Sequence, residues 1–276
     1  MSAGRRNVDV VSLADRLIAA GAAATPLETL TSTEPGFDVP SAYAVLSAIG
    51  SRRVAAGWRP LGRKMGFTNA KIWPRYGVTE PMWASMWDRT VHFVGAEGAL
   101  SVGAFTGPRI EPEVVLKLRT ALPAGVGSRD VLEAVEWIAA GFEIVQCPFP
   151  GWKFRPADSI AAFGLHAALA VGEPLELTPA VRDALARELG TFTLTLLRDG
   201  VEVERGVGAN VLGSPALALA HLGTLLATQP DAPPLAAGEI VTTGTITDAW
   251  PVAAGQRWSS EYGTLGIRGV TLRIDA

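Results

Sequence analysis

The sequence predicts an α+β fold in which a helical N-terminal region precedes a β-rich region. Near the N-terminus, apolar residues recur at helical spacing over Val10–Ala20 and again over Pro40–Ala56. From Thr90 onward, short strand-like segments separated by Gly and Pro dominate, with few helices between them. Helices grouped apart from strands are typical of the α+β class. We expect residues 1–88 to form a helical lead-in region and residues 89–276 to form the β-rich domain.

Glycine and proline mark the ends of the early segments. Gly21 and Gly57 follow the two helical segments, where glycine is favoured as a C-cap. Glycines on both sides of the basic pair Arg63-Lys64 permit close backbone approach and a bend. Prolines then break the chain ahead of Met82–Trp87, and we expect that stretch to act as a mobile cover.

The β-rich region contains two further predicted helices. Asp130–Ala140 is predicted to be a helix that leads into a strand over Gly141–Val145. Ser214 followed by proline is a favoured helix start, so the segment up to Ala227 is predicted to be helical.

Composition excludes several classes of protein. With 276 residues, 48% of them hydrophobic and 18% charged, the chain has enough apolar residues for a large folded core. A net charge of -3 gives no electrostatic basis for binding nucleic acid. No apolar stretch approaches the ~20 residues that span a bilayer, and no signal segment follows Met1, so we expect no membrane partner and a cytoplasmic location. The single cysteine, Cys147, is predicted to be a packed apolar side chain.

The most informative chemical feature is a pair of acids, Glu111 and Glu113, in a strand-like apolar segment. Side chains two positions apart on a strand point to one face, so both carboxylates are directed to the same place. Like charges beside apolar residues are unfavourable unless a cation lies between them. Pro112, between them, cannot donate to a ladder and indicates an edge, a strand start or a bulge. A solvated edge strand is the alternative interpretation.

A second acid pair, Glu202 and Glu204, serves as a comparison. It lies in a predicted β-hairpin whose turn is Asp199-Gly200, and each glutamate is followed or preceded by a valine that faces the core. We therefore expect these two acids to face solvent. Spacing alone does not make a metal site.

Glu143 is the third candidate carboxylate, because it lies in an apolar segment where an unpaired charge is costly. Three carboxylates without cysteine or histidine ligands fit Mg²⁺, with Mn²⁺ as the alternative. The three histidines, His92, His166 and His221, show no metal-ligand spacing.

An ordered set of motifs then resembles the fumarylacetoacetate hydrolase superfamily, and within it the branch of 2-keto-4-pentenoate hydratases and 4-oxalocrotonate decarboxylases. The likeness runs from about Tyr43 to the C-terminus. The motifs that carry it are Gly62–Thr68, Glu111-Pro112-Glu113, Phe142–Val145, Trp152-Lys153, Ala157-Asp158 and Gly238–Thr245.

This resemblance implies a helical N-terminal part on a mixed β-roll, with Mg²⁺ held by the three glutamates Glu111, Glu113 and Glu143. It also implies that Lys64 reaches into the site and that Asp158 lies close to the metal and its water. It further implies a homo-oligomer, a pentamer or a decamer.

The chemistry expected from these residues is acid–base catalysis on a 2-keto or 2-hydroxydienoic acid. Lys64, near the cation and partly desolvated, is expected to have a lowered pKa and to take or give a proton. A surface lysine is the alternative for this residue.

Further residues are assigned to substrate binding. Arg63 and Lys153 are the basic candidates, and Thr243 and Thr245 can hydrogen-bond substrate oxygens, although ordinary strand threonines have the same pattern. Ser159 stands where the branch usually has asparagine after the aspartate, which leaves the placement of water open. Five tryptophans near these segments suggest a bulky apolar substrate tail or, alternatively, core packing.

We therefore expect a Mg²⁺-dependent hydratase of 2-hydroxy-2,4-dienoates that gives 4-hydroxy-2-oxo acids. A decarboxylase of a 2-oxo-3-enedioate is the first alternative, and its second carboxylate requires a cation such as Arg75, Arg109, Lys153 or Arg155. An acylpyruvate-type carbon–carbon hydrolase, which relies on a His-Glu pair, ranks third, because no histidine was found in a matching place. A non-catalytic keto-acid binder is the alternative from another class.

Overall fold

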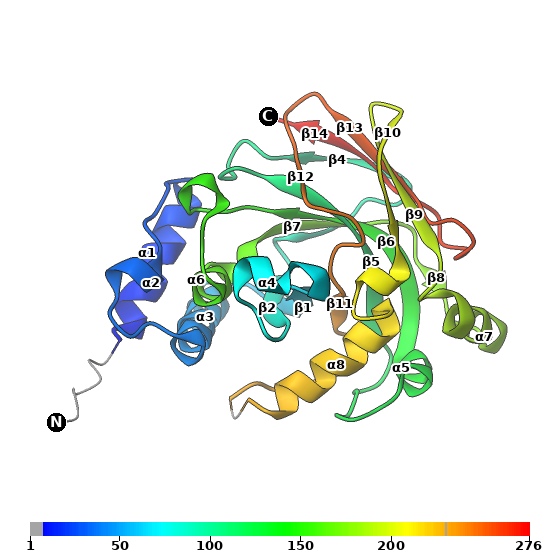
Figure 1. Ribbon diagram of the computed structural model, residues 1–276, viewed down its shortest axis with the longest axis horizontal. Coiled ribbons are helices and arrows are strands. Elements are labelled where there is room, and N and C mark those ends of the chain that lie inside the picture. Colours follow the sequence, from blue (N-terminus) through cyan, green and yellow to red (C-terminus); the bar gives the residue numbers. More distant parts are fainter. Residues whose placement is uncertain (1–7, 230) are drawn as a thin grey trace.

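The computed structural model describes residues 8–229 and 231–276, which form two β-sheets with helices along one side and below (Figure 1). The α-helices are α1 (Val10–Ala22), α2 (Leu30–Thr33), α3 (Val39–Ala55), α4 (Trp73–Tyr76), α5 (Ser128–Ala134), α6 (Pro156–Ala161), α7 (Pro179–Glu188) and α8 (Pro215–Ala227). Short 3-10 turns are η1 (Ala70–Ile72), η2 (Pro150–Trp152), η3 (Phe163–Leu165) and η4 (Gly208–Asn210).

The larger sheet runs in the order β2-β1-β11-β5-β6-β7-β3, with β12 beside β5 and β8 beside β6. Its strands are β1 (Pro60–Gly66), β2 (Met82–Trp87), β3 (Val91–Phe93), β5 (Arg109–Leu118), β6 (Val135–Val145), β7 (His166–Val171), β8 (Leu175–Glu176), β11 (Ile240–Thr242) and β12 (Trp250–Pro251). The pairs β1/β11 and β3/β7 are parallel and the others are antiparallel. The sheet is therefore mixed, as expected.

The smaller sheet has the order β10-β9-β13-β14-β4. Its strands are β4 (Glu97–Ser101), β9 (Thr193–Arg198), β10 (Val201–Val207), β13 (Arg257–Glu261) and β14 (Thr271–Asp275). It lies over the upper and right part of the larger sheet in Figure 1. Buried side chains of both sheets form one apolar cluster, which includes Trp258, Leu194, Phe142 and Ile110. The predicted α+β class is confirmed.

The two predicted N-terminal helices are confirmed as α1 and α3. Asp9 and Asp38 act as N-caps, because their carboxylates accept hydrogen bonds from backbone amides three residues later. Gly21 does not end the first helix, which continues to Ala22. Together with α6, these helices enclose a second apolar cluster at the left of Figure 1.

The predicted helix over Asp130–Ala140 is wrong in its second half. Helix α5 ends at Ala134, and β6 begins at Val135 and continues without a break to Val145. Ala139 and Ala140 lie opposite Val115 and Val114 of β5, so long-range strand pairing overrides the local helical spacing. A buried strand and a buried helix have similar apolar runs, which is why periodicity alone misassigned this segment.

The expectation of a mobile cover over Met82–Trp87 is also wrong. This stretch is β2, which pairs antiparallel with β1 and places Ala84 opposite Lys64. All of its side chains are buried except that of Ser85, which is half-buried. Prolines before the segment mark the entry to a strand, not a lid.

The predicted hairpin is confirmed by β9 and β10, which Asp199 and Gly200 connect. A bulge between Glu202 and Glu204 offsets the two acids. Glu202 pairs with the exposed Arg205, whereas Glu204 accepts hydrogen bonds from the Asp248 amide. Glu202 is therefore solvated as expected, whereas Glu204 hydrogen-bonds the loop that contains Asp248.

Helix α8 begins at Ser214 and Pro215 as predicted, and it is the most apolar helix of the described chain. Within residues 8–229 and 231–276, the stretch Gly208–Ala227 alone is long and apolar enough to cross a membrane, and 61% of it is buried inside the fold. It packs against α5. Its apolar residues are thus accounted for by the core.

The predicted boundary at residues 88 and 89 falls inside the larger sheet. Strands β1 and β2 precede it, and β1 pairs with β11 at Gly62 to Lys64. The lead-in region therefore contributes two strands as well as helices to the structure around the site.

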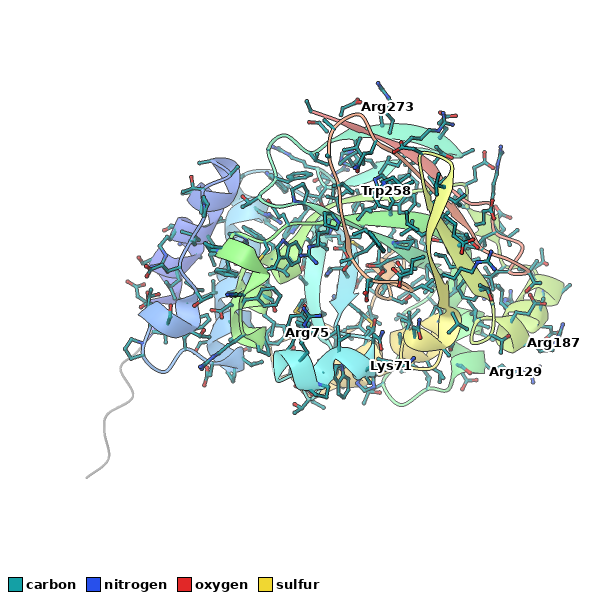
Figure 2. The ribbon with its side chains drawn as sticks, turned by 45° about the horizontal axis from the view of Figure 1, so that its top comes forward. Lys71, Arg75, Arg129, Arg187, Trp258 and Arg273 are labelled. Carbon is teal, nitrogen blue, oxygen red and sulfur yellow. The ribbon has the colours of Figure 1, made fainter. Side chains whose placement is uncertain are left out.

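Trp258 provides a test of the packing between the sheets. Figure 2 shows it inside the molecule, and it is fully buried. We expect Trp258→Ala to lower the free energy of unfolding by about 3–5 kcal/mol, because it leaves a cavity in the core. Urea denaturation measures this change. Arg257→Ala, at an exposed neighbouring position with a surface ion pair to Glu97, is expected to cost less than about 1 kcal/mol. Equal effects of the two variants would contradict the packing described here.

Candidate metal centre

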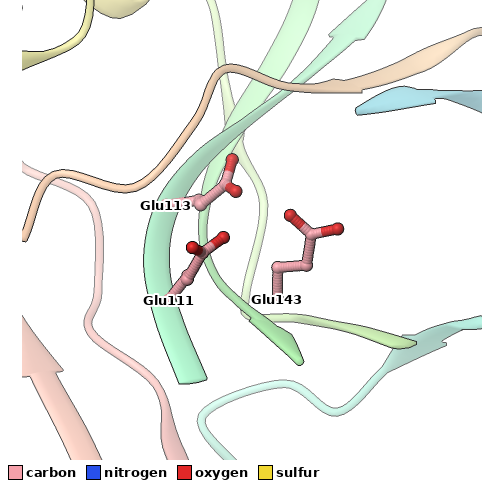
Figure 3. Close-up of side chains that lie close together, drawn as sticks. All are labelled: Glu111, Glu113 and Glu143. Carbon is pink, nitrogen blue, oxygen red and sulfur yellow. The ribbon is translucent and has the colours of Figure 1, made fainter. Parts of the chain in front are cut away.

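The register between β5 and β6 builds the candidate site. Glu111 lies directly opposite Glu143 on the two antiparallel strands, and Glu113 lies two residues further along the same face of β5. One oxygen of each carboxylate lies within 4.8 Å of the others. Figure 3 shows the three side chains converging from the two strands. Glu113 and Glu143 are fully buried and Glu111 is half-buried.

Pro112 lies at an interruption in the pairing of β5. On that side, β11 pairs with β5 only from Val115 to Lys117, and β12 pairs only with Arg109 and Ile110. A proline without an N–H is tolerated where no ladder bond is required. The Pro112 carbonyl instead accepts a hydrogen bond from the Ile246 amide at 3.1 Å. The proline therefore marks a gap in a central strand, not a sheet edge.

The loop that crosses this gap fixes the orientation of Glu113. The Gly244 amide donates a hydrogen bond to Glu113 Oε2 at 2.8 Å. Gly244 has a φ of 102°, and a Cβ there would lie 1.9 Å from Thr68 Oγ1, so only glycine fits. On the other side of β5, Tyr262 Oη donates to the Glu113 carbonyl at 2.6 Å.

Lys64 lies against the acids from β1. Its Nζ is 3.3 Å from Glu143 Oε2 and donates a hydrogen bond to the Gly164 carbonyl at 3.0 Å. The expected lowering of the pKa of Lys64 supposes a cation beside it and stays a prediction; in the chain without a metal the pKa shifts the other way. Although burial opposes its charge, the attraction of Glu143, Glu111 and Glu113 outweighs burial and raises the pKa of Lys64. The side chain is therefore an ammonium ion.

The three glutamates differ in their protonation. Burial raises the pKa of Glu111 to about 7 and raises the pKa of Glu113 well above its ordinary value, and Glu143 adds to both through its negative charge. For Glu143 burial acts in the same direction, but Lys64 and His166 outweigh it and hold its pKa below the ordinary value. Of the three acids, Glu143 is thus the one most readily ionised.

His166 is a residue of this centre that the sequence did not reveal. Its Nδ1 lies 2.7 Å from Glu143 Oε1 and its Nε2 lies 2.9 Å from Thr90 Oγ1. Burial lowers the pKa of His166, so the ring is neutral and its Nδ1–H donates to the carboxylate. In the sequence, the indication was that His166 is a single polar residue at the start of the apolar segment Ala167–Val171. Placing it beside Glu143 requires the pairing of β6 with β7.

The donor set fits a hard divalent cation. Glu113 Oε1 is buried without a hydrogen-bond partner, and Glu143 Oε2 is likewise without one, its nearest cation being Lys64. Buried carboxylate oxygens left unpaired are costly unless a cation binds them. Oxygen atoms from three carboxylates are the ligands that Mg²⁺ and Mn²⁺ prefer.

Asp158 lies at the start of α6 and is fully buried. Its carboxylate accepts hydrogen bonds from the Thr31 amide, the Thr31 hydroxyl and the Arg155 amide, each at 2.8 Å. The next residue, Ser159, donates its hydroxyl to the Pro156 carbonyl at 2.8 Å. Both oxygens of Asp158 are therefore engaged in joining α2 to α6.

The four predicted substrate-binding residues lie in different places. Arg63 faces away from the acids, with its guanidinium 3.4 Å from Glu239 Oε1. Lys153 is exposed. Thr243 is buried and donates to the Val114 carbonyl at 3.4 Å, and Thr245 donates to the Thr247 carbonyl at 3.0 Å. The structure brings the two threonines to the loop that crosses β5 and leaves Arg63 outside the centre.

Comparisons with known proteins agree on one family. The sequence pattern described as fumarylacetoacetate (FAA) hydrolase C-terminal matches residues 75–272. A 2-hydroxyhexa-2,4-dienoate hydratase of Comamonas testosteroni is 30% identical over 244 residues, which cover 88% of this chain and 89% of that protein. A 2-keto-4-pentenoate hydratase of Burkholderia vietnamiensis is 28% identical over 260 residues, which cover 93% and 95%.

A solved structure extends the likeness to three dimensions. It is the 4-oxalocrotonate decarboxylase of Pseudomonas putida G7 in complex with magnesium and adipate, with a TM-score of 0.88 and 26% identity. The match covers 98% of this chain and all of that one. This similarity extends to the N-terminal helices, which precede the matched family pattern.

The raised pKa of Glu111 predicts how the stability of the metal-free protein depends on pH. A carboxyl group whose folded-state pKa is raised stabilises the fold below its unfolded value, and this stability is lost as the pH rises through about 7. We expect up to about 3 kcal/mol to be lost from this group between pH 5 and pH 8.5. Differential scanning fluorimetry in EDTA measures the change.

The variant Glu111→Gln removes this ionisation, so its stability should fall less over the same interval. His166, whose pKa is lowered, acts in the opposite direction near pH 6 and remains in both proteins, so their difference reports the ionisation of Glu111 together with its effect on Glu113 and Lys64. Glu202→Gln, on the exposed hairpin, is the matched control and should keep the original pH dependence. An unchanged pH dependence in Glu111→Gln would refute the raised pKa.

Proposed function

Because the chain belongs to the fumarylacetoacetate hydrolase family, we propose that it is a Mg²⁺-dependent hydratase that adds water to a 2-hydroxy-2,4-dienoate and forms a 4-hydroxy-2-oxo acid. The observation that carries the proposal is the convergence of three carboxylates, with Glu113 Oε1 buried without a hydrogen-bond partner among the described residues and Glu143 Oε2 held there only by its ion pair with Lys64. Relatives named as hydratases over most of the chain support it.

Glu111, Glu113 and Glu143 would hold the cation, Mg²⁺ or alternatively Mn²⁺. Bound there, it would supply a Lewis acid for the 2-oxygen and the adjacent carboxylate of the substrate. His166 fixes the orientation of Glu143 by a hydrogen bond, and the Gly244 amide does the same for Glu113. Both ligands are therefore positioned before any ion arrives.

Lys64 is proposed to move the proton. Its ammonium group donates a proton to C5 of the dienol, and the resulting amine takes up the proton of the 2-hydroxyl, which leaves the conjugated 2-oxo-3-enoate and restores the ammonium group. Water then adds at C4 and C3 takes a proton, so the sum is the addition of one water molecule. The hydrogen bond to the Gly164 carbonyl holds Nζ in place for this transfer. Asp158 is left out of the transfer, because Thr31 and Arg155 engage both of its oxygens.

A row of aromatic rings supports an apolar substrate tail. The ring centroids of Phe67 and Tyr76 lie 5.5 Å apart, and those of Tyr76 and Phe154 lie 5.7 Å apart. Phe67 follows β1 and Phe154 precedes α6, so the row spans the segments that carry Lys64 and Asp158. Figure 2 shows Arg75 on the neighbouring helix α4, where it is exposed. If a substrate tail extends along these rings, they suit the hydratase, whose substrates need no second carboxylate; Phe67 and Phe154 also pack on the apolar cluster of the N-terminal helices.

Decarboxylation of a 2-oxo-3-enedioate is the second candidate, and Arg109 favours it. Its guanidinium lies 4.2 Å from the ring centroid of Trp152, and its charge lowers the pKa of Glu111. A cation this close to the acids is suited to a second substrate carboxylate. The similar decarboxylase structure adds support.

Carbon–carbon hydrolysis is not supported by the His-Glu pair that the structure contains. His166 bonds Glu143 through one ring nitrogen and Thr90 through the other, and the residue is buried. A general base for water needs a free ring nitrogen that water can reach. This pair is better suited to holding a metal ligand.

Metal binding tests the first part of the proposal. We expect Mg²⁺ at about 100 times its Kd to stabilise the protein by about 2.7 kcal/mol, because it binds the folded chain only. In Glu143→Gln the cation loses its most readily ionised ligand, so both the calorimetric binding signal and the rise in Tm should disappear. Glu202→Gln should keep both. Binding of Mg²⁺ to Glu143→Gln with unchanged affinity would contradict the assigned ligands.

Turnover tests the second part. With Mg²⁺, the protein should deplete the absorbance of 2-hydroxypenta-2,4-dienoate, and Lys64→Met should lower kcat by about 10²-fold or more, the usual contribution of acid–base catalysis. Lys117→Met, a lysine of the same sheet paired with Glu136, should leave kcat unchanged. No depletion with a panel of dienoates would rule out the hydratase.

The same assay separates the two candidates. With a 2-oxo-3-enedioate, release of carbon dioxide that falls in Arg109→Gln would establish the decarboxylase instead. Hydration that is unaffected by Arg109→Gln, with no carbon dioxide released, supports the hydratase.

A further inference from the structure

A pocket lies between the N-terminal helices α1 and α3 and strands β3 and β4, and His166 is among its lining residues. It has a volume of about 870 Å³. Pockets of this size accommodate small organic molecules. Arginines, aromatic rings and His166 share its lining, whereas the three glutamates of the metal centre are not part of it.

Arg53 dominates the chemistry of this pocket. It projects from the last turn of α3, and its guanidinium lies 4.4 Å from the ring centroid of Phe163, 4.8 Å from that of Trp58 and 5.5 Å from that of Trp87. Burial lowers its pKa to about 10, and no acid counteracts that effect. Among residues 8–229 and 231–276, no carboxylate pairs with it and no acceptor hydrogen-bonds its side chain.

An unpaired, largely buried cation is unfavourable, and aromatic faces compensate only in part. The guanidinium nitrogens of Arg53 have no hydrogen-bond partner in the described part of the chain, yet they are not among the fully buried polar atoms. They are therefore accessible from the pocket. Arg53 therefore presents free hydrogen-bond donors to the pocket. Donors in a guanidinium fork match a carboxylate.

The remaining charges leave the pocket positive. Arg52 is neutralised by Asp15, the one acid in the lining. Arg89 lies 5.0 Å from the Trp58 ring and donates to the Ala56 carbonyl, and its neighbour Asp88 is bonded to Arg59. Two arginines, Arg53 and Arg89, therefore face this space without a carboxylate bonded to either.

We propose that this pocket binds a small organic carboxylate with a flat apolar body, at a site distinct from the metal centre. The carboxylate pairs with Arg53, and the body lies among the rings of Trp58, Phe163 and Phe105. A carboxylate fits better than a phosphate, because apolar side chains make up much of the lining and offer few further donors.

The pocket adjoins the metal centre through one side chain. His166 is among the residues that line the pocket, and its ring hydrogen-bonds Glu143. His166 thus lies between the proposed carboxylate site and Glu143. The pocket shares His166 with the metal centre, but its lining includes none of the three glutamates and not Lys64, so the proposed carboxylate site does not require the proposed catalytic function.

Benzoate is the probe that tests the proposal. Isothermal titration of the Mg²⁺-supplemented full chain should show saturable binding of benzoate, and neutral benzamide and inorganic phosphate should bind at least tenfold more weakly. Arg53→Gln should weaken benzoate about tenfold or more, as expected for the loss of a charge-assisted hydrogen bond. Arg129→Gln, an exposed arginine at the periphery in Figure 2, should leave it unchanged.

Two further variants test the proposed carboxylate site independently of Arg53→Gln. Arg89→Gln should weaken benzoate binding even if Arg53→Gln fails to fold. Glu143→Gln, which removes a metal ligand, should still bind benzoate, and this separates the site from the metal centre whether or not the chain is a hydratase. The proposal is overturned if benzoate does not bind, if benzamide binds equally well, if phosphate binds more tightly, or if Glu143→Gln abolishes binding.

Discussion

The antiparallel register of β5 and β6 is the constraint on which the candidate centre depends. It places Glu111 opposite Glu143 and brings Glu113 to the same face, so the positions of all three acids follow from one pairing. A shift by one residue would turn both acids of β5 to the other face. The long ladder that fixes this register passes through an almost completely buried segment, and the energy of core packing therefore holds like charges together.

The groups around the three glutamates reduce the free-energy cost of burying three carboxylates close together. Lys64 and His166 both act on Glu143 and favour its ionised form, whereas Glu113 and Glu111 retain protons more readily. The backbone amide of Gly244 and the carbonyl of Gly164 fix the side chains of Glu113 and Lys64 without adding a charge. The centre is therefore preorganised by neutral hydrogen bonds, and its net charge stays low until a cation binds.

Much of this was predictable because local signals and long-range structure agreed. Apolar periodicity located α1 and α3, Ser214 with Pro215 located the start of α8, and strand spacing together with the resemblance to a family singled out Lys64 and the three glutamates that the structure brings together. Where packing decides, the sequence was insufficient. Residues 135–140 have helical spacing but pair as a strand, and Arg63 and Lys64 are adjacent in sequence but face opposite sides of β1. His166 became visible only through the pairing of β7 with β6.

Asp158 has a consequence for how the chain can be divided. The matched family pattern begins at residue 75, yet the fully buried carboxylate of Asp158 is satisfied from Thr31, in the N-terminal helical region. A fragment that starts at residue 75 would lose two of the three hydrogen-bond donors to this carboxylate, together with the helices that pack on α6. The N-terminal helices are thus part of the same folding unit as α6, although they precede the matched family pattern.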